Sequence, residues 1–550
     1  MAESPHIVGL GLEELKLLLV QALEEFARLK TENAELRDEI ARLKGLKGRP
    51  DIKPSKPSGM QAATEPAAKT GSSKRRRGSK RAKLSITETT VIKATNVPAG
   101  ARFKGYEEFV VQDLIIETRT TLYRRERWQL ASGETVVAPL PDGITSRVEP
   151  EARFAATAGG ALRRDGPELK RFVLAQYHQG QTTMPRLLGL LQGLGLDISK
   201  RQLVRLHNAG QGAFLAEARD VLRAGLETAP WITVDDTGAR HKAQNGVCTQ
   251  IGNDDFTAFV TTGSKSRLNF LELLNAGDST HLVNDAATAD MREHGLAHTV
   301  IAQLAAEPDK RFADRATWTA HLTALGISAL AVQHDPVRIA TEGALWGAIA
   351  AQGRLGGTVI VSDGAGQFDV GHHALCWVHA ERLVHKLDAF TEERRVAKEA
   401  IRARIWQLYA DLKAYARTSM HGAPTPAART ELSERFDTIF TSTSCFALLD
   451  RQLKRLFAKK AKLLAVLERP DVALHTNGLE NDIRAHVTRR KVSGGTRSDS
   501  GRDCRDACLG LMKTCAKQEI RFWDYLGARL DVPSAPVVAS LPALIRAAPS

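Results

Sequence analysis

Two apolar runs that each end at an acid constrain the fold of this chain more than any other feature. The first is PWITVDD, residues 230–236, and the second is GGTVIVSD, residues 356–363. Both are short, rich in β-branched residues and bounded by Pro, Gly or acids, so each predicts a buried strand. Side chains at strand ends of an α/β sheet reach into a crevice while the sheet fixes their backbone. The sequence therefore predicts an α/β fold with Asp235, its neighbour Asp236 and Asp363 at strand ends.

The residues around these runs switch between strand and helix patterns. GVCTQIG and FTAFVTTG flank a turn at residues 253–255 and predict a hairpin. Helical insertions are predicted at about 264–355 and 388–470, and a further helix from about 502 to 529. A third acid, Glu480, lies at the start of a predicted helix in TNGLENDIRAHVTRRK, residues 476–491.

Three carboxylates that converge from separate elements can hold two Mg²⁺ ions roughly 3.5–4 Å apart, which clamp the oxygens of an in-line phosphoryl transfer. A strand ending in Asp, a hairpin, a second strand ending in Asp and a late helix bearing Glu is the order of the ribonuclease H-like fold in its DDE form. Each acid alone also has a structural interpretation, because acids cap helices. Asn477 followed three residues later by Glu480 has the spacing of a capping box.

A heptad seam near the start predicts a leucine-zipper coiled coil over residues 1–46. Apolar side chains recur at intervals of four and three along it. A single Asn at an a position favours a parallel, in-register pair, so we expect self-association. The alternative is an amphipathic helix packed on the body of the protein. The residues that define the dimer seam are Leu15, Leu29, Asn33, Leu36 and Leu43.

The net charge of +14 indicates a polyanionic partner, and nucleic acid is the usual one. The most basic run, KRRRGSKRAK, lies in residues 47–84, whose Pro, Ser, Gly and Lys content predicts a flexible basic linker. Phosphate contact and simple solvation are both open for it. The residues proposed to contact DNA here are Lys74, Arg75, Arg76 and Arg77.

Two small modules are expected before the first strand. Residues 85–165 predict a β-rich module. Residues 166–226 predict a helix-turn-helix-like region of short helices, with Thr182 and Ser199 as caps. A short turn before a basic, capped helix fits a helix that lies in a major groove, although any three-helix bundle has similar punctuation. The basic residues of that last helix are Lys200, Arg201 and Arg205.

Other sequence features indicate the cellular compartment of the protein. It has no run of 18 apolar residues, so no membrane span is expected, and its start lacks the pattern of a secretory signal. Its six cysteines form no disulfide-like framework, which indicates a reducing, cytoplasmic interior. Cys504 and Cys508, one turn apart, are expected to be buried helix residues. The Pro/Ala-rich tail, residues 531–550, is predicted to be disordered.

Three blocks resemble the conserved blocks of one family. TVDDTGAR, VSDGAGQF with CWVHAER, and TNGLENDIRAHVTRRK look like those of bacterial insertion-sequence DDE transposases with an N-terminal leucine zipper, of the IS sixty-six type. The likeness covers roughly residues 229–530 and the first 60 or so. It implies a ribonuclease H-like catalytic domain over residues 227–530 and a DNA transposase that binds terminal inverted repeats, hydrolyses phosphodiesters and transfers strands to target DNA.

The resemblance also assigns roles to single residues. It implies that Asp235, Asp363 and Glu480 are the catalytic ligands of two Mg²⁺ or Mn²⁺ ions. Site support falls on Asp236, Cys376, His379 and Asn477, and phosphate contacts on Arg484, Arg490 and Lys491. It further implies small accessory proteins of the element as partners and a place on the bacterial nucleoid.

The chain departs from the family's pattern in four ways. No paired cysteines occur before Cys248, so the zinc finger usual after the zipper is not expected. Asp236 stands where Glu is commoner, and Asn481 stands where Arg is usual, which weakens a phosphate contact. The first two acids are far apart, and this leaves Asp285 and Asp335 as outside candidates for the second ligand.

Cys376 and His379 also raise the question of zinc. With His372 or His373 they would supply three ligands, whereas a closed structural site needs four. No fourth is evident nearby, so we expect no zinc, and a packed Cys with a hydrogen-bonded His is the alternative. Two other functions stay open at this point, namely an inactive DNA-binding regulator derived from a transposase and a structure-specific nuclease.

Overall fold

The structure is a computed structural model. It describes residues 86, 88–93, 101–107, 109–139, 166–330, 334–419, 426–533 and 535–548, and the side chains of Asn477, Leu479 and Glu480 lie outside this description. The chain divides into two compact units, Met1–Ile116 and Glu117–Ser550. The predicted zipper and the basic linker lie outside the described residues. All helices and strands below belong to the second unit.

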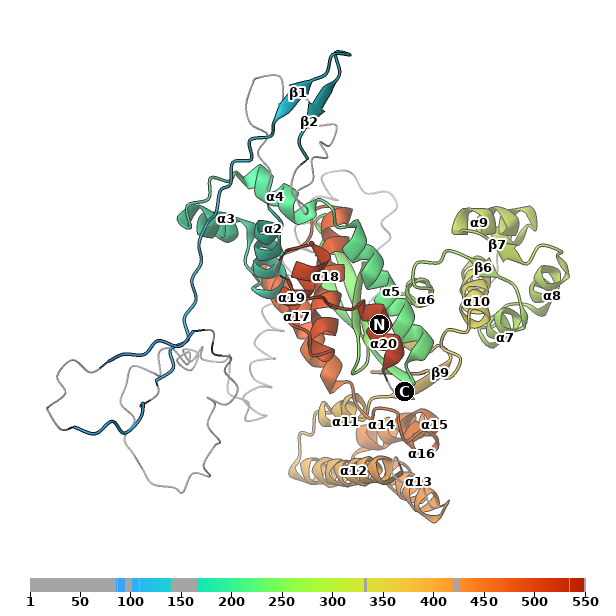
Figure 1. The fold of residues 1–550 in the computed structure, drawn as a ribbon. Coiled ribbons are helices and arrows are strands. Elements are labelled where there is room, and N and C mark those ends of the chain that lie inside the picture. The colour runs from blue at the N-terminus through green and yellow to red at the C-terminus, as the bar shows by residue number, and fades with distance from the viewer. Residues whose placement is uncertain are drawn as a thin grey trace, which may run out of the picture. The chain divides into compact units, whose positions relative to one another are not determined.

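A five-stranded mixed sheet forms the core of this unit (Figure 1). Its order is β5-β4-β3-β8-β9, with β3 at Trp231–His241, β4 at Gln244–Gly252, β5 at Thr257–Thr262, β8 at Val359–Ser362 and β9 at His372–Leu375. β3, β4 and β5 form an antiparallel meander, whereas β8 runs parallel to β3, and β9 runs parallel to β8. Both predicted apolar strands and the predicted hairpin are present, while β9 was not expected.

The two faces of the sheet pack against different helices. Successive side chains of a strand point to opposite faces. Ile232 of β3 lies in the core that includes α5, Gly212–Thr228. Ala239 has the opposite parity and packs with Ile483 of α17, Asn477–Ser493. Odd-numbered residues of β3 therefore face α17, and even-numbered residues face α5.

A mostly helical block follows β5, where an insertion was expected. Its elements are α6 (Arg267–Leu274), β6 (His281–Leu282), α7 (Asp285–Glu293), α8 (His298–Ala306), β7 (Arg311–Phe312), α9 (Arg315–Ala324), η5 (Ile327–Ala329) and α10 (Pro336–Ala351). The block has its own core, in which Trp318 and Met291 are fully buried. The block is joined to the sheet through α6 and α10, because Phe270 and Leu345 lie in the core that includes Ile232.

A second helical block follows β9. Its helices are α11 (Trp377–His385), α12 (Glu392–Ser419), α13 (Pro426–Phe440), α14 (Ala447–Phe457), α15 (Lys460–Leu463) and α16 (Ala465–Glu468). Trp377, Phe436 and Phe440 lie at the centre of its core. The Trp377 indole donates a hydrogen bond of 2.8 Å to the carbonyl of Leu463, which satisfies its only polar atom.

Four short elements precede α5. They are α2 (Pro167–Leu174), the π-helical turn η4 (Ala175–Gln179), α3 (Met184–Gly193) and α4 (Lys200–Asn208). Leu203 of α4 is buried with Val173 and Leu187 in a small core. The residues of α4 that face solvent include Lys200 and Arg201. The start of the basic helix predicted here is therefore exposed.

The caps of these helices were predicted in part. Ser199 caps α4 through a complete capping box with Gln202, as expected. Thr182 is not the cap of α3. That position belongs to Thr183, whose side chain makes no capping bond, because the helix begins with Met184 and Pro185.

Ser199→Ala should therefore lower the free energy of unfolding of this region by about 1 kcal/mol, the usual value of a Ser cap. Thr183→Ala is the matched control and should change it by only a few tenths of that. Thermal melts followed by circular dichroism measure both. Equal shifts for the two variants would contradict the capping assignment.

The last helices correct two predictions. The single helix expected from 502 to 529 is two helices, α18 (Asp499–Lys517) and α19 (Phe522–Arg529), separated at Glu519, whose φ is +56°. The predicted disordered tail is wrong for 535–548, because α20 (Leu541–Ala547) buries Leu541 and Ile545 in the core shared with α5. Short runs of Leu, Pro and Ala were too weak a pattern to reveal this helix.

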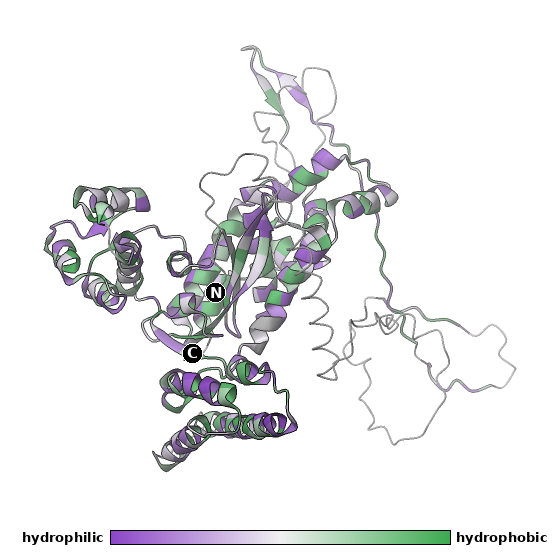
Figure 2. Ribbon diagram, turned by 180° about the vertical axis from the view of Figure 1, so that it is seen from behind, coloured by the Kyte–Doolittle hydropathy of each residue, from purple (hydrophilic) through white to green (hydrophobic). Residues whose placement is uncertain are grey.

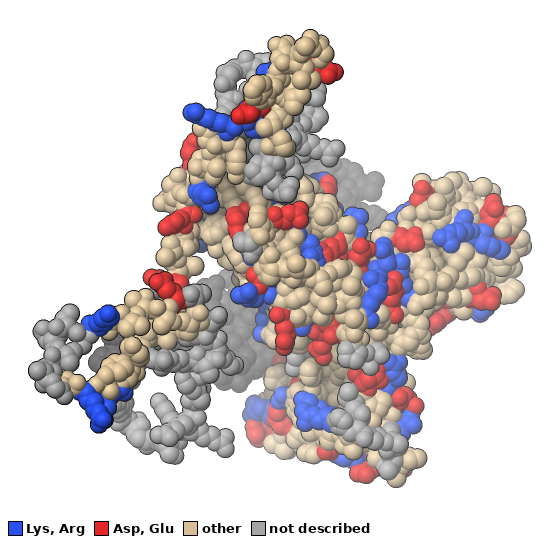
Figure 3. Space-filling view, in the orientation of Figure 1, with Lys and Arg blue, Asp and Glu red and all other residues tan. Residues whose placement is uncertain are grey.

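The surface is mixed in character. Apolar and polar residues alternate around most helices, as Figure 2 shows. Acidic and basic side chains are intermingled on the face in Figure 3. The strands β1 (Arg127–Gln129) and β2 (Thr135–Val137) form an antiparallel hairpin within the region predicted to be β-rich. Among the described helices, none is long and apolar enough to cross a membrane.

Candidate active site

Asp235 and Asp363 lie side by side just past the point where the parallel pairing of β3 with β8 ends. Asp363 directly follows β8, as predicted, but Asp235 and Asp236 are not at a strand end, because β3 continues to His241 along β4. The register of β3 and β8 pairs Thr233 with Val361. Asp235 lies two residues after Thr233, and Asp363 lies two residues after Val361. Neighbouring strands are about 4.8 Å apart. Asp235 has the parity of Ala239, so its side chain belongs to the face that α17 covers. Two acids that are distant in the sequence are thus neighbours at the point where β3 and β8 separate.

The electrostatics of the pair favour a bound cation. Burial raises the pKa of Asp235, and the nearby charge of Asp363 raises it further, although a hydrogen bond from the Asp236 amide and the charge of His379 oppose this. The Asp236 amide is 2.7 Å from Asp235 Oδ1. Among the described residues, neither Asp235 nor Asp363 forms an ion pair with Lys or Arg. A divalent cation would relieve this repulsion, and carboxylate oxygens are the ligands that Mg²⁺ prefers.

Asp236 points to the opposite face of the sheet. Its Oδ1 accepts a hydrogen bond of 2.5 Å from Thr249 Oγ1, and its Oδ2 accepts one of 3.0 Å from Gln367 Nε2. Gln367 lies in the short helix η6, Gly366–Phe368, that follows Asp363. Asp236 therefore links β3, β4 and the loop after β8, and it supports the position of Asp363 from behind.

The helix that carries Glu480 begins beside this edge of the sheet. Thr476, just before α17, donates from its hydroxyl to the sulfur of Cys376 at 3.6 Å. The Trp377 amide donates to the carbonyl of Leu474 at 3.0 Å. The N-cap of α17 is Thr476, so Asn477 is the first helical residue and not the cap. The directions of the Asn477 and Glu480 side chains lie outside the described structure.

Cys376 and His379 form a polar pair next to Asp363. Cys376 is buried at the N-cap of α11, and its amide donates to the carbonyl of Ser362 at 2.8 Å. A hydrogen bond to Cys376 raises the pKa of His379, aided by the charge of Asp363 and opposed by burial. Burial alone would raise the pKa of Cys376, but hydrogen bonds from His379 and Thr476 lower it. These directions favour a cationic His379 beside Asp363, balanced by the sulfur of Cys376.

The other two histidines do not join this pair. His373 is engaged by Ser362, whose Oγ lies 2.8 Å from its Nε2, and burial lowers its pKa to about 4. His372 is exposed at the start of β9. Within the described part of the chain, neither histidine groups with Cys376 and His379 as possible metal ligands.

The basic residues predicted near the third acid have different surroundings. Arg490 of α17 donates to the carbonyl of Gly238 in β3 and so attaches the helix to the sheet. Arg484 donates to Asn481 at 3.1 Å, so the residue that departs from the family's pattern holds a neighbouring cation. Lys491 is exposed. These cations lie along one helix that begins at the candidate site.

Two other placements bear on the site. Asp285 begins α7 and Asp335 caps α10 through the amide of Arg338, so both belong to the first helical block and are not paired with Asp235.

Lys459 is a basic residue near the site that was not predicted from the sequence. Its Nζ lies 3.5 Å from the place a side chain at Gly364 would occupy, directly after Asp363. It stands in a run of lysines between helices, where no pattern separates it from its neighbours.

Comparison with known proteins places the chain in a family. Residues 347–503, which include Asp363 and Glu480, match the family described as Transposase IS66 family. The uncharacterized protein y4jO of Sinorhizobium fredii (strain NBRC 101917 / NGR234) is 46% identical over 327 residues, which cover 60% of this chain and 99% of that protein. The chain belongs to the transposase IS66 family.

Proposed function

We propose that this protein is a DDE-type DNA transposase with a ribonuclease H-like catalytic domain. It would bind the terminal inverted repeats of an element, hydrolyse a phosphodiester at each end and join the freed 3′-OH to target DNA. The observation that carries the proposal is the pairing of Asp235 and Asp363 on adjacent parallel strands, on one face, beside the start of α17. The strand order, an antiparallel meander followed by two parallel strands, supports the fold assignment.

The donor set fits two hard divalent cations. Asp235, Asp363 and Glu480 would hold Mg²⁺ or Mn²⁺, which when bound supply Lewis-acid activation of water and neutralise charge that develops on the phosphate. The raised pKa of Asp235 supports this assignment, because a carboxylate pair without a cation is costly. Asp236 would keep the loop after β8 in place through Gln367. Cys376 and His379 would fix the start of α11 next to Asp363 and place positive charge beside it.

DNA would be held by cations on separate elements. Lys200, Arg201 and Arg205 of α4 fit phosphate or groove contact. Arg484 and Lys491 of α17 would contact phosphates near the acids. The zipper would pair two copies, as the joining of two element ends requires. Accessory proteins of the element and a nucleoid location in the cytoplasm belong to the same proposal.

A plasmid assay tests the proposal. Supercoiled plasmid that carries an element end is incubated with protein and Mg²⁺ or Mn²⁺, and nicked and joined products are counted. Glu480→Ala should lower the rate by more than ~100-fold, since outer-shell partners of metal ligands alone cost about 10–100-fold. Glu434→Ala, at an exposed carboxylate of α13, is the control and should retain activity.

The other outcomes identify the alternatives. Tight binding of the element end with no cleavage by the wild-type protein would indicate a DNA-binding regulator. Nicking of branched DNA with no strand joining would indicate a structure-specific nuclease. Equal activity of wild type and Glu480→Ala would remove Glu480 from the reaction.

A further inference from the structure

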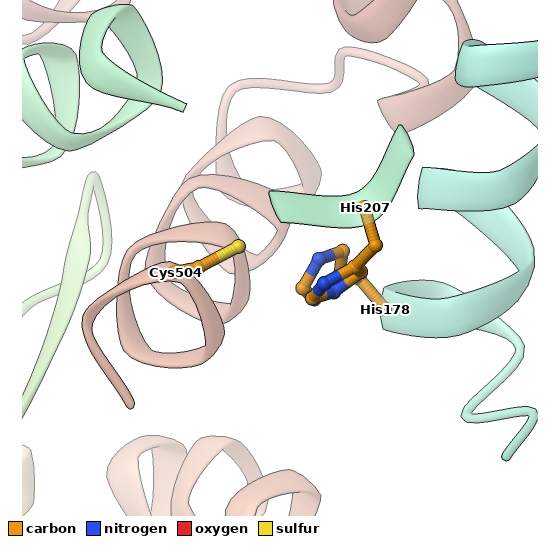
Figure 4. A group of neighbouring side chains, drawn as sticks. All are labelled: His178, His207 and Cys504. Carbon is orange, nitrogen blue, oxygen red and sulfur yellow. The ribbon is translucent and has the colours of Figure 1, made fainter. Parts of the chain in front are cut away.

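Three potential metal ligands meet far from the candidate active site. They are His178 of the π-helical turn η4, His207 near the end of α4 and Cys504 of α18. All three are buried, and their ligand atoms lie within 4.8 Å of one another. Figure 4 shows the two imidazoles side by side with the sulfur facing them. The centroids of the two imidazole rings are 5.1 Å apart, and the angle between the ring planes is 24°.

Both histidines present an unused nitrogen. His207 Nδ1 lies 2.7 Å from Asn208 Oδ1, an acceptor, so this nitrogen carries the proton and Nε2 keeps its lone pair. Nε2 of His207 and Nε2 of His178 are buried without a hydrogen-bond partner. Such orphaned nitrogens are costly, and a metal-ligating His has this arrangement of one bonded and one open nitrogen.

The protonation states also suit a metal. Burial lowers the pKa of His178 well below its usual range, and it lowers the pKa of His207 to about 4. Burial thus favours the uncharged form of both rings, which is the form that ligates metals. Arg489 stacks over Tyr177 beside them and opposes protonation further.

Cys508, one turn along α18, is our candidate for a fourth ligand, although its sulfur lies outside the group of three. Cys508 is buried, and its hydrogen bond with Cys504 raises its pKa. Two thiolates and two imidazoles form one of the common sets of structural zinc ligands. Bonds of roughly 2.0–2.3 Å to zinc hold ligand atoms within about 4 Å of one another, so the Cys508 side chain would turn toward the histidines and release its proton when zinc binds. The two thiolate charges would offset the repulsion between the ion and Arg489.

We propose that His178, His207, Cys504 and Cys508 bind one structural Zn²⁺ ion. The ion would fasten α4, with its basic residues, to α18, which packs on β5 through the bond of Thr514 to Thr257. Zinc was not expected from the sequence because these ligands lie in segments that are hundreds of residues apart. This proposal does not depend on the proposed function.

Metal analysis of the full-length protein tests it. After purification and dialysis against excess Mg²⁺, mass spectrometry of the metals should find about one zinc per chain. Cys504→Ser and His207→Gln should weaken zinc binding by more than ~100-fold in competition with a chromophoric chelator. Cys515→Ser, at a buried thiol of the same helix, should leave it unchanged, as should Cys376→Ser at the other Cys–His pair.

X-ray absorption spectroscopy of the wild-type protein identifies the zinc ligands directly, even if a variant fails to fold. A zinc shell with both nitrogen and sulfur, and sulfur at about 2.3 Å, supports the site. Wild-type protein without zinc, a shell of oxygen alone, or zinc that is lost in Cys376→Ser but kept in Cys504→Ser would overturn the proposal.

Discussion

Asp235→Asn should abolish metal-dependent DNA cleavage, whereas Asp236→Asn should lower its rate far less. The two acids are adjacent in the sequence, but they point to opposite faces of the sheet. Asp235 lies beside Asp363, while Asp236 is bonded to Thr249 and Gln367. Loss of a ligand should lower the rate by more than ~100-fold, and loss of a supporting bond by roughly 10-fold, the low end of the cost for an outer-shell partner. The plasmid assay measures both.

The same pair separates loss of function from loss of fold. Without metal, Asp235→Asn should be at least as stable as wild type, because burial and Asp363 raise the pKa of Asp235 and so disfavour its charge. A carboxyl whose folded pKa is raised loses stability as pH rises from its unfolded pKa, about 3.9, through the folded value. The free energy of unfolding of Asp235→Asn should therefore increase relative to that of the wild type as pH rises through that window. Mg²⁺ should raise the melting temperature of wild type and not that of Asp235→Asn.

Two results would contradict this assignment. One is cleavage by Asp235→Asn at the wild-type rate. The other is a greater loss of activity in Asp236→Asn than in Asp235→Asn, which would place the ligand on the other face of the strand.

Trp377→Ala should lower the free energy of unfolding of the second helical block by about 3–5 kcal/mol, far more than the loss of the Ser199 cap. The side chain is 1% exposed, packs near Phe436 and Phe440, and donates to the carbonyl of Leu463. Its amide also bonds to Leu474, just before α17. The variant keeps this backbone bond, so its cost comes from the cavity and from the carbonyl of Leu463 that loses its donor.

Urea unfolding followed by circular dichroism measures this effect, with Trp406→Ala as the control. Trp406 lies on α12 of the same block and is 38% exposed, so its removal should cost far less. Similar losses for the two variants would show that burial at Trp377 does not dominate the stability of this block.

The part of the fold that could be predicted from the sequence is the part set by local pattern. The two apolar strands and the hairpin have short-range signals, and so does the cap at Ser199. Strand β9 was missed because His372 and His373 begin it, and only its position at the edge of a parallel sheet makes such a strand stable. The helix α20 was missed because it depends on burial against α5.

The candidate site was predicted in the same uneven way. Strand ends marked Asp235 and Asp363 as candidates, and their adjacency needed the parallel register that only the fold supplies. Pattern could not tell Asp235 from Asp236, because the two differ by which face they occupy. Gln367, His178 and His207 have no local signature, since their partners lie in distant segments.

The helix α20 covers apolar surface of α5, so its loss would affect how long the protein survives in the cell. A premature stop codon before Leu541 would leave all three acids encoded, yet it would uncover the apolar surface on α5 that Leu541 and Ile545 now cover. Proteases degrade chains that expose such surface. A gene copy that carries this lesion would thus be silenced through turnover of its product, with its catalytic codons intact.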